Sequence, residues 1–334
     1  MRIREWIGAK LALGLPGPSL TPDAVACLRQ TQAQSLVVFA RNFATTEQFL
    51  TLLRDAEAAV GHRLVVMVDH EGGRVIRFSR DVTRFPAALT VGSRQEADAV
   101  RQQGAIEAQE LKRLGVHVNL APCVDVIRES ADPVIGDRSY GTDPVRVAEL
   151  GVARIQGLES HGVAACAKHF PGLGAVPLDP HQRLPTIPLT WETLERVDLV
   201  PFRAAVTTQV AMIMSSHVCY PALGDPPGLP ATFSCRLIHS LLRERLQFDG
   251  LVLTDDLEMG ALQAYGGIGE AAVRATEAGH DILLICSDLQ AGCAAAAALQ
   301  ASYESGRLDE QELAESVQRF SAMRQGVLGE PLAG

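Results

Sequence analysis

Short runs of apolar and β-branched residues recur along the chain, separated by longer segments of mixed polarity. We distinguish eight such runs, at 11–15, 35–40, 64–69, 116–121, 163–169, 210–216, 251–255 and 281–287. Continuous apolar runs of this length are typical of strands that are buried on both faces, as in a parallel sheet. The pattern therefore predicts eight strands.

Helix signals lie between these runs. Three predicted helices begin at capping residues, namely Thr21 before a proline, Thr45 with Gln48 at capping-box spacing, and Ser93 with Glu96 at the same spacing. Helical periodicity continues the alternation with the strands at 142–157, 190–207, 234–245, 269–278 and 289–303.

The position of the polar residues distinguishes two α/β folds. A doubly wound open sheet concentrates polar residues at one switch point, whereas a barrel gathers them at the carboxyl ends of many strands. Here polar residues end strand after strand: Arg41-Asn42, Asp69-His70-Glu71, Asp125, Lys168-His169, Ser216-His217, Asp255-Asp256 and Ser287. We therefore predict a single-domain (β/α)8 TIM barrel that spans residues 1–334.

Composition narrows the choice of function. The 334 residues are 47% hydrophobic and carry a net charge of -9, which excludes a disordered chain and argues against nucleic acid as a partner. The chain lacks an apolar run of about 18 residues, so we expect no membrane span. The seven cysteines are scattered and indicate free thiols in a reducing compartment. We expect a cytoplasmic monomer.

Two strand ends carry candidate chemistry that a structural role explains poorly or only in part. Asp69 precedes a turn with two glycines, where it caps the turn or points into the barrel mouth. Lys168 and His169 end an otherwise apolar strand, where a buried charge needs a partner. Lys168 is either a Schiff-base nucleophile, or it joins His169 as a hydrogen-bond donor to a polyhydroxylated ligand.

Three further segments contribute charged side chains. Segment 170–189 holds five prolines and no apolar period, and is predicted to be a long, mobile loop. Within it Asp179 stands two residues from His181, a spacing that lets the acid orient the ring. Asp255 heads a carboxylate pair after the seventh strand, and Arg138 lies in a polar loop, where a surface ion pair with Asp137 is the simpler interpretation.

In combination these motifs resemble glycoside hydrolase family 3, and within it the single-domain bacterial β-N-acetylhexosaminidases of cell-wall recycling. The motifs occur in the order that the family shows: VDHEGGRVIRF, APCVDV, GDRSYGTDP, KHFPGLGAV with DPH, MSSHVCYPAL and FDGLVLTDDLEM. The ordered set spans essentially the whole chain and is much more specific than any single motif.

The resemblance implies a role for each matching position. Asp255 matches the nucleophile, and His181 matches the acid/base with Asp179 as its partner. The sugar-binding positions fall on Asp69, Arg77, Arg138, Lys168 and His169. These roles describe a retaining exo-β-N-acetylglucosaminidase (EC 3.2.1.52 type) that acts on muropeptides from peptidoglycan through a covalent glycosyl-enzyme.

The match also departs from the family pattern at three positions, two of them in the loop. Leu173 replaces a second histidine, Pro180 replaces a common serine, and His70 stands where glutamine is common. Three alternatives stay open: another family 3 glycosidase or a phosphorylase, a lyase that uses Lys168, and an inactive sugar-binding barrel. The chain contains no P-loop, dinucleotide fingerprint or metal-binding cluster motif, so we expect no cofactor and no metal.

Overall fold

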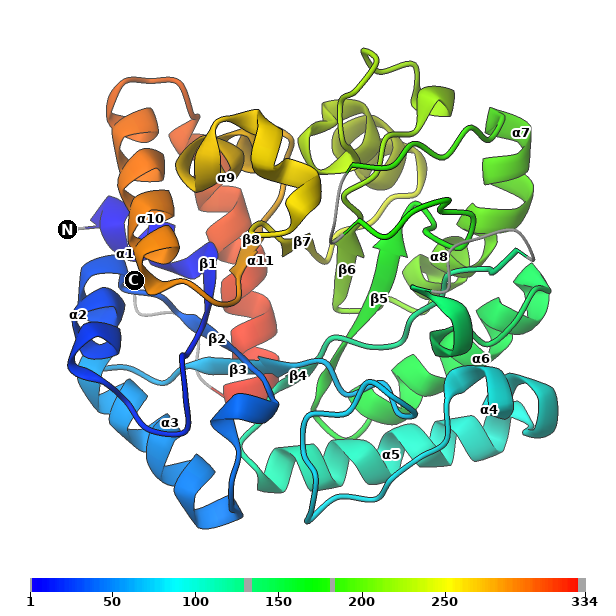
Figure 1. Ribbon diagram of the computed structural model, residues 1–334, viewed down its shortest axis with the longest axis horizontal. Helices are drawn as coiled ribbons and strands as arrows, with labels where there is room; N and C mark the ends of the chain where they lie inside the picture. The colour runs from blue at the N-terminus through cyan, green and yellow to red at the C-terminus, as the bar shows by residue number, and fades with distance from the viewer. Residues whose placement is uncertain (1, 129–133, 181–183, 330–334) are drawn as a thin grey trace.

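The computed structural model describes residues 2–128, 134–180 and 184–329, and its eight strands form a closed parallel barrel (Figure 1). Each strand pairs with its neighbours in chain order, and β8 closes the barrel against β1. The fold prediction is therefore confirmed. The strands are β1 (Leu11–Gly14), β2 (Ser35–Val38), β3 (Val65–Val68), β4 (Val118–Asn119), β5 (Ala164–Phe170), β6 (Met212–Ser215), β7 (Leu251–Asp256) and β8 (Ile282–Ile285).

Helices surround the barrel, and the first helix of the described chain, α1, packs against the last two, α10 and α11 (Figure 1). The α-helices are α1 (Arg2–Ala9), α2 (Pro22–Thr31), α3 (Thr46–Val60), α4 (Ala88–Arg94), α5 (Ala97–Arg113), α6 (Pro144–Glu159), α7 (Trp191–Thr193), α8 (Leu199–Thr207), α9 (Gly267–Glu277), α10 (Leu289–Glu304) and α11 (Glu310–Leu328). Wider π-helical turns occupy Leu194–Asp198 and Arg236–Arg245. Among the described residues, none of the helices combines the length and the apolar character that crossing a membrane requires.

The capping predictions are confirmed at two of three positions. The hydroxyls of Thr21 and Thr45 accept hydrogen bonds from the third residue beyond each of them, at 3.2 Å in both helices. The prediction for Ser93 is wrong. Ser93 lies inside α4, where its hydroxyl donates to the carbonyl of Thr90, and α5 begins only after Glu96.

The strands are buried so completely that only one of them exposes side chains. Every residue of β1 to β6 and of β8 is buried, as expected for parallel strands covered by helices. In β7, the final residues Asp255 and Asp256 are the two that keep partial exposure. The carboxyl end of β7 therefore opens onto the barrel mouth.

Close contact between β1 and the residue after β8 leaves no room for a side chain at Gly14. A Cβ atom there would lie 1.9 Å from the carbonyl oxygen of Cys286. We expect Gly14→Ala to lower the free energy of unfolding by about 1–3 kcal/mol, because the two backbones have to separate. Urea unfolding measures the loss, and Gly17→Ala is the matched control, since its Cβ would meet nothing within 4 Å. Equal stability of the two variants would contradict the close contact.

Candidate active site

A cavity of about 450 Å³ opens at the carboxyl ends of the strands, where a TIM barrel carries its active site. All the predicted site residues that the structure describes line this cavity: Asp69, Arg77, Arg138, Lys168, His169, Asp179 and Asp255. His181 lies outside the described residues. The structure thus brings together side chains that are up to 186 positions apart in the sequence, Asp69 and Asp255.

A larger cavity of about 670 Å³ lies at the opposite ends of β5, β6 and β7. Its lining is mostly apolar and includes three charged residues, Glu159, Asp249 and Arg319. The smaller cavity has by far the denser set of charged groups, so we take it as the candidate active site.

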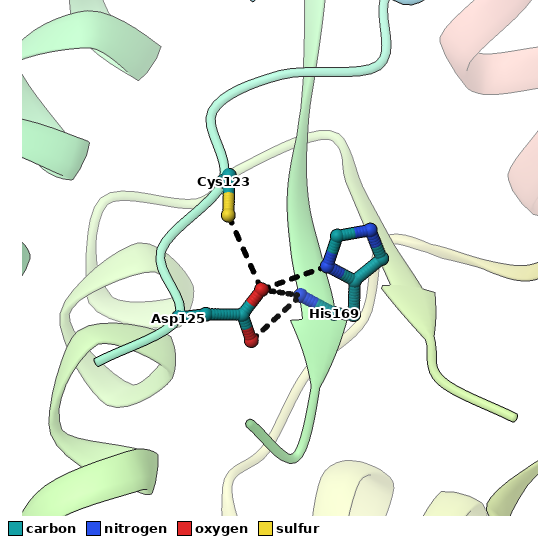
Figure 2. A group of neighbouring side chains, drawn as sticks. All are labelled: Cys123, Asp125 and His169. Carbon is teal, nitrogen blue, oxygen red and sulfur yellow. Dashed lines mark hydrogen bonds and ion pairs between the residues drawn. The ribbon is translucent and has the colours of Figure 1, made fainter. Parts of the chain in front are cut away.

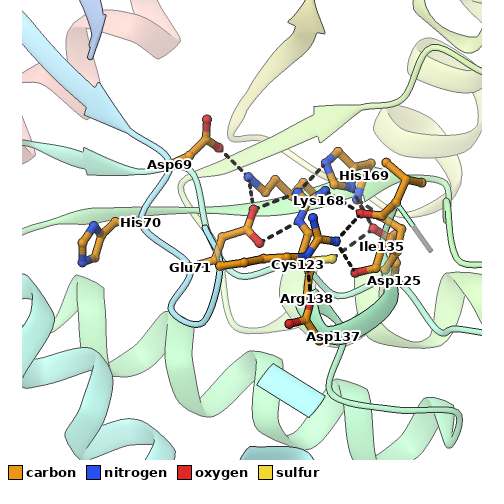
Figure 3. Close-up of polar contacts among 12 residues, drawn as sticks. Asp69, His70, Glu71, Cys123, Asp125, Ile135, Asp137, Arg138, Lys168 and His169 are labelled. Atoms are coloured by element: carbon orange, nitrogen blue, oxygen red, sulfur yellow. Dashed lines mark hydrogen bonds and ion pairs between the residues drawn. The ribbon is translucent and has the colours of Figure 1, made fainter. Parts of the chain in front are cut away.

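Lys168 is held between two carboxylates (Figure 3). Its Nζ lies 2.6 Å from Asp69 Oδ1 and 2.7 Å from Glu71 Oε1. Glu71 in turn accepts two hydrogen bonds from Arg138, from Nε and Nη2, both at 2.8 Å. Arg138 therefore pairs with Glu71 and not with its neighbour Asp137, which instead contacts Arg74 at 2.6 Å.

This network sets the charge of its members. Burial alone would lower the pKa of Lys168, but Asp69 and Glu71 outweigh it and raise the pKa above its ordinary value. Burial alone would raise the pKa of Glu71, but Arg138 and Lys168 hold it well below its usual range. Lys168 is therefore a permanently charged hydrogen-bond donor at neutral pH. A Schiff-base lysine needs the opposite, a lowered pKa.

Asp125 holds the ring of His169 through a hydrogen bond to Nδ1 (Figure 2). Asp125 Oδ2 accepts a hydrogen bond from His169 Nδ1 at 2.7 Å and from Cys123 Sγ at 3.2 Å. Asp125 Oδ1 accepts from the backbone N–H of Leu173 at 2.6 Å. Burial would raise the pKa of Asp125, but His169 and these donors keep it below its ordinary value.

The same three side chains are close enough to ligate a metal ion. Their donor atoms lie within 4.8 Å of one another in the described part of the chain. However, both oxygens of Asp125 and Nδ1 of His169 already take part in hydrogen bonds within the protein. The arrangement is therefore that of a hydrogen-bonded unit that orients His169.

Asp255 and Asp256 differ in environment although they are adjacent. Loss of water around Asp255 would raise its pKa, but the Asp256 N–H and the charge of Lys168 contribute to holding it below the ordinary value. That N–H lies 2.8 Å from Asp255 Oδ1. Burial raises the pKa of Asp256 to about 6, and its carboxylate accepts the Glu258 N–H at 3.1 Å. Of the two, Asp255 is therefore the carboxylate that stays ionised to lower pH, and a nucleophile has to be ionised.

Arg77 lies at the edge of the cavity. Its guanidinium is 3.6 Å from Asp69 Oδ2 and 5.5 Å from the centre of the Phe39 ring. The backbone N–H of Arg77 donates to Nδ1 of His70 at 3.3 Å. Burial, Arg154 and Arg77 lower the pKa of His70 to about 4, so this ring is neutral and holds the turn that carries Arg77.

The predicted loop reaches the cavity through Asp179. The next residue, Pro180, accepts a hydrogen bond at its carbonyl from the N–H of Ala261, which follows β7. Further along, Ile187 donates to Cys219 at 2.9 Å. The described parts of the loop thus lie against the segments after β6 and β7, and the pairing of Asp179 with His181 stays a prediction.

Sequence reasoning missed the roles of Glu71 and Asp125. Both were recognised as polar residues at strand ends, but nothing in one sequence shows that Glu71 pairs with Lys168 or Asp125 with His169. The available signal was charge balance, because the buried Lys168 and the partly buried Arg138 together require more than the single carboxylate of Asp69.

Comparison with known proteins identifies the class. Residues 10–323 match the family described as glycosyl hydrolase family 3 N terminal domain. The chain therefore belongs to glycosyl hydrolase family 3.

Individual relatives define the type of enzyme. A Beta-hexosaminidase from Idiomarina loihiensis is 36% identical over 84% of both chains, and one from Nitrosomonas eutropha is 38% identical over 83% of this chain and 80% of its own. The structure of a family 3 β-N-acetylglucosaminidase from Paenibacillus sp. str. FPU-7 superposes with a TM-score of 0.94 at 36% identity. It is matched by 98% of this chain, which spans 63% of that longer protein. The chain is a glycoside hydrolase of the β-hexosaminidase type.

A further solved structure carries a ligand. NagZ from Neisseria gonorrhoeae, in complex with N-trifluoroacetyl-D-glucosamine, superposes with a TM-score of 0.80 at 31% identity. The match covers 98% of this chain and 91% of that one. Unlike the Paenibacillus protein, this relative has nearly the same extent as the chain described here.

Proposed function

We propose that the protein is a retaining exo-β-N-acetylglucosaminidase in which Asp255 attacks the anomeric carbon. The observation that carries the proposal is an ionised carboxylate at the mouth of the barrel, facing a cavity lined by Lys168, Arg138 and Asp69. Attack forms a covalent glycosyl-enzyme, and water then releases the sugar with retained configuration.

The charges around the cavity suit a neutral, polyhydroxylated ligand. Lys168 and Arg138 are donors, Asp69 is an acceptor, and each already has a partner of opposite charge. Hydroxyl groups of a sugar can bind both kinds of side chain without bringing a net charge. Similarity to β-hexosaminidases supports terminal β-linked N-acetylglucosamine as the sugar, and we propose muropeptides derived from peptidoglycan as its source.

We assign the acid/base role to His181, oriented by Asp179, from the match to the family motif. An imidazole with an ordinary pKa of about 6.5 can exchange protons near neutral pH without the burial that a glutamic acid would need. Since His181 belongs to the loop 170–189, we propose that this mobile loop completes the site when it closes over the sugar. A ligand complex with His181 remote from the glycosidic oxygen would argue against closure.

The same proposal covers domain organisation and surroundings. The site draws on the ends of β3, β5 and β7, so we treat residues 1–334 as one catalytic domain. All seven cysteines are free, five of them buried, which supports a reducing compartment such as the cytoplasm. We propose that the enzyme acts there as a monomer.

Two alternative activities were left open by the sequence, a Lys168 lyase and a phosphorylase. The lyase is not supported, because Lys168 is charged and paired with two carboxylates. Phosphorolysis keeps Asp255 and differs only in the acceptor of the sugar. If the enzyme turns over faster in phosphate than in a non-phosphate buffer and releases a sugar phosphate, it is a phosphorylase and not a hydrolase.

Hydrolysis of aryl glycosides tests the sugar specificity in wild type and the acid/base assignment in a His181 variant. We expect wild type to hydrolyse aryl β-N-acetylglucosaminides in preference to aryl β-glucosides. His181→Ala should lower kcat/KM by about 10²–10⁴-fold for a poor leaving group. The loss should be much smaller for a nitrophenolate, which leaves without a proton. Equal losses for both leaving groups would contradict acid catalysis by His181.

A further inference from the structure

The tautomer of His169 follows from the two groups beside its ring (Figure 3). Nδ1 lies 2.7 Å from Asp125 Oδ2, and Nε2 lies 3.3 Å from Arg138 Nη2. A guanidinium only donates hydrogen bonds, so Nε2 has to accept in this contact. An ionised carboxylate only accepts, so Nδ1 carries the proton. The two contacts therefore favour the Nδ1–H tautomer, with the lone pair on Nε2.

We propose that Asp125 is a positioning residue that holds His169 as the Nδ1–H tautomer, so that Nε2 accepts a hydrogen bond from a sugar hydroxyl. This reverses the donor role that the sequence suggested for His169. The inference rests on the proposed function, in which His169 binds the sugar. It adds a residue to the site, and it specifies which hydrogen-bond partner the sugar must offer.

Both flanking groups are themselves fixed. Asp125 is 0% exposed, and it also accepts the backbone N–H groups of Leu173 at 2.6 Å and of His169 at 3.3 Å. On the other side, Nη2 of Arg138 uses one hydrogen for Glu71 and directs the other toward His169. The tautomer is thus set before the sugar binds, which avoids reorganisation during binding.

The contact with Arg138 leaves room for a ligand. A separation of 3.3 Å is longer than a typical N–H donor distance of about 2.9–3.0 Å, so this hydrogen bond is weak. His169 lines the cavity, and a hydroxyl that donates a shorter hydrogen bond can compete for the lone pair. A sugar hydroxyl in this position would donate to His169 and could accept from Arg138.

Nitrogen NMR tests the tautomer directly, without any assay of activity. In protein labelled with ¹⁵N-histidine, we expect His169 to show a protonated Nδ1 and an unprotonated Nε2 at neutral pH, with the resonances assigned from a His169→Gln spectrum. Asp125→Asn should transfer the proton to Nε2, because the new amide donates to Nδ1. Cys123→Ala is the matched control: it removes another hydrogen bond to Asp125 and should keep the Nδ1–H form. A wild-type ring protonated at Nε2 would overturn the proposal even if Asp125→Asn does not fold.

Modified sugars test the consequence for binding. We expect wild type to lose about 10- to 100-fold in kcat/KM when the hydroxyl facing His169 is replaced by fluorine, as much as when it is replaced by hydrogen, because fluorine cannot donate. In Asp125→Asn the fluoro compound should recover relative to the deoxy compound. If wild type tolerates fluorine at every ring position, the acceptor role is wrong. If wild type hydrolyses no aryl N-acetylglucosaminide, the proposed function is wrong. The NMR experiment does not depend on activity, so it still tests the tautomer in that case.

Discussion

Asp255→Ala is expected to lower kcat by on the order of 10⁴-fold or more, because removal of a nucleophile abolishes the covalent route and leaves only the residual catalysis of the site. The environment of Asp255 predicts that the loss is chemical. Its carboxylate faces the cavity and keeps the charge that attack requires. Binding of the sugar depends on other side chains, so we expect KM to change much less than kcat.

Rescue by a small anion separates the loss of a nucleophile from misfolding. Azide should enter the space left by the carboxylate, restore part of the activity of Asp255→Ala and yield the α-glycosyl azide, since it attacks from the same face. Asp249→Ala is the matched control, because Asp249 is exposed at the opposite end of the barrel and should keep wild-type turnover. Wild-type turnover in Asp255→Ala would show that the proposed mechanism is wrong.

The second large effect is expected from Glu71, the centre of the charged network that lines the cavity. Glu71→Ala should lower the free energy of unfolding by about 3–5 kcal/mol, because it leaves Arg138 without its bidentate partner and Lys168 with one carboxylate fewer. Urea unfolding followed by circular dichroism measures the loss. Glu277→Ala is the control: it breaks a surface pair with Arg307 and should cost about 1 kcal/mol or less. Equal costs for the two variants would contradict the role of burial.

The contribution of Glu71 also has a defined pH dependence. Its pKa is lower in the folded protein than in the unfolded chain, so ionised Glu71 stabilises the fold at neutral pH. This stabilisation should decline as the pH falls below the ordinary glutamate value of about 4.3, and vanish only below the folded pKa. The difference in stability between wild type and Glu71→Gln should therefore narrow in acid. A difference that stays constant from neutral pH into strong acid would contradict the ion pairs.

The sequence predicts the barrel well because buried parallel strands leave continuous apolar runs, and each of the eight runs coincides with a strand to within a few residues at either end. It predicts the helices less completely, since α1, α4 and α11 were missed. Helix α4 shows why. Its sequence includes Thr90, Val91 and Gly92, which favour a helix poorly. The helix instead depends on contact with a distant segment, because a Cβ at Gly92 would lie 1.9 Å from the carbonyl oxygen of Tyr140.

The site was predictable as a set of strand ends but not as a set of pairs. Parallel strands place their carboxyl ends at one mouth, so Asp69, Lys168 and Asp255 were expected to meet. Which acid pairs with which base depends on side-chain reach across the barrel. For that reason the pairing of Glu71 with Lys168, and of Asp125 with His169, is apparent only in the structure.

The carboxylate of Asp125 connects the ring of His169, which we propose binds the sugar, to the loop that carries the proposed acid/base. It accepts hydrogen bonds from both His169 and Leu173. Changes in the two parts are therefore coupled, and their energetic effects should not add. A loop exchanged with a relative, for example one with histidine at position 173, would alter how the ring presents its lone pair. Selectivity for the sugar and closure of the loop would then have to evolve together. Variant libraries that change only the loop, or only the residues around His169, would contain mostly enzymes of reduced activity.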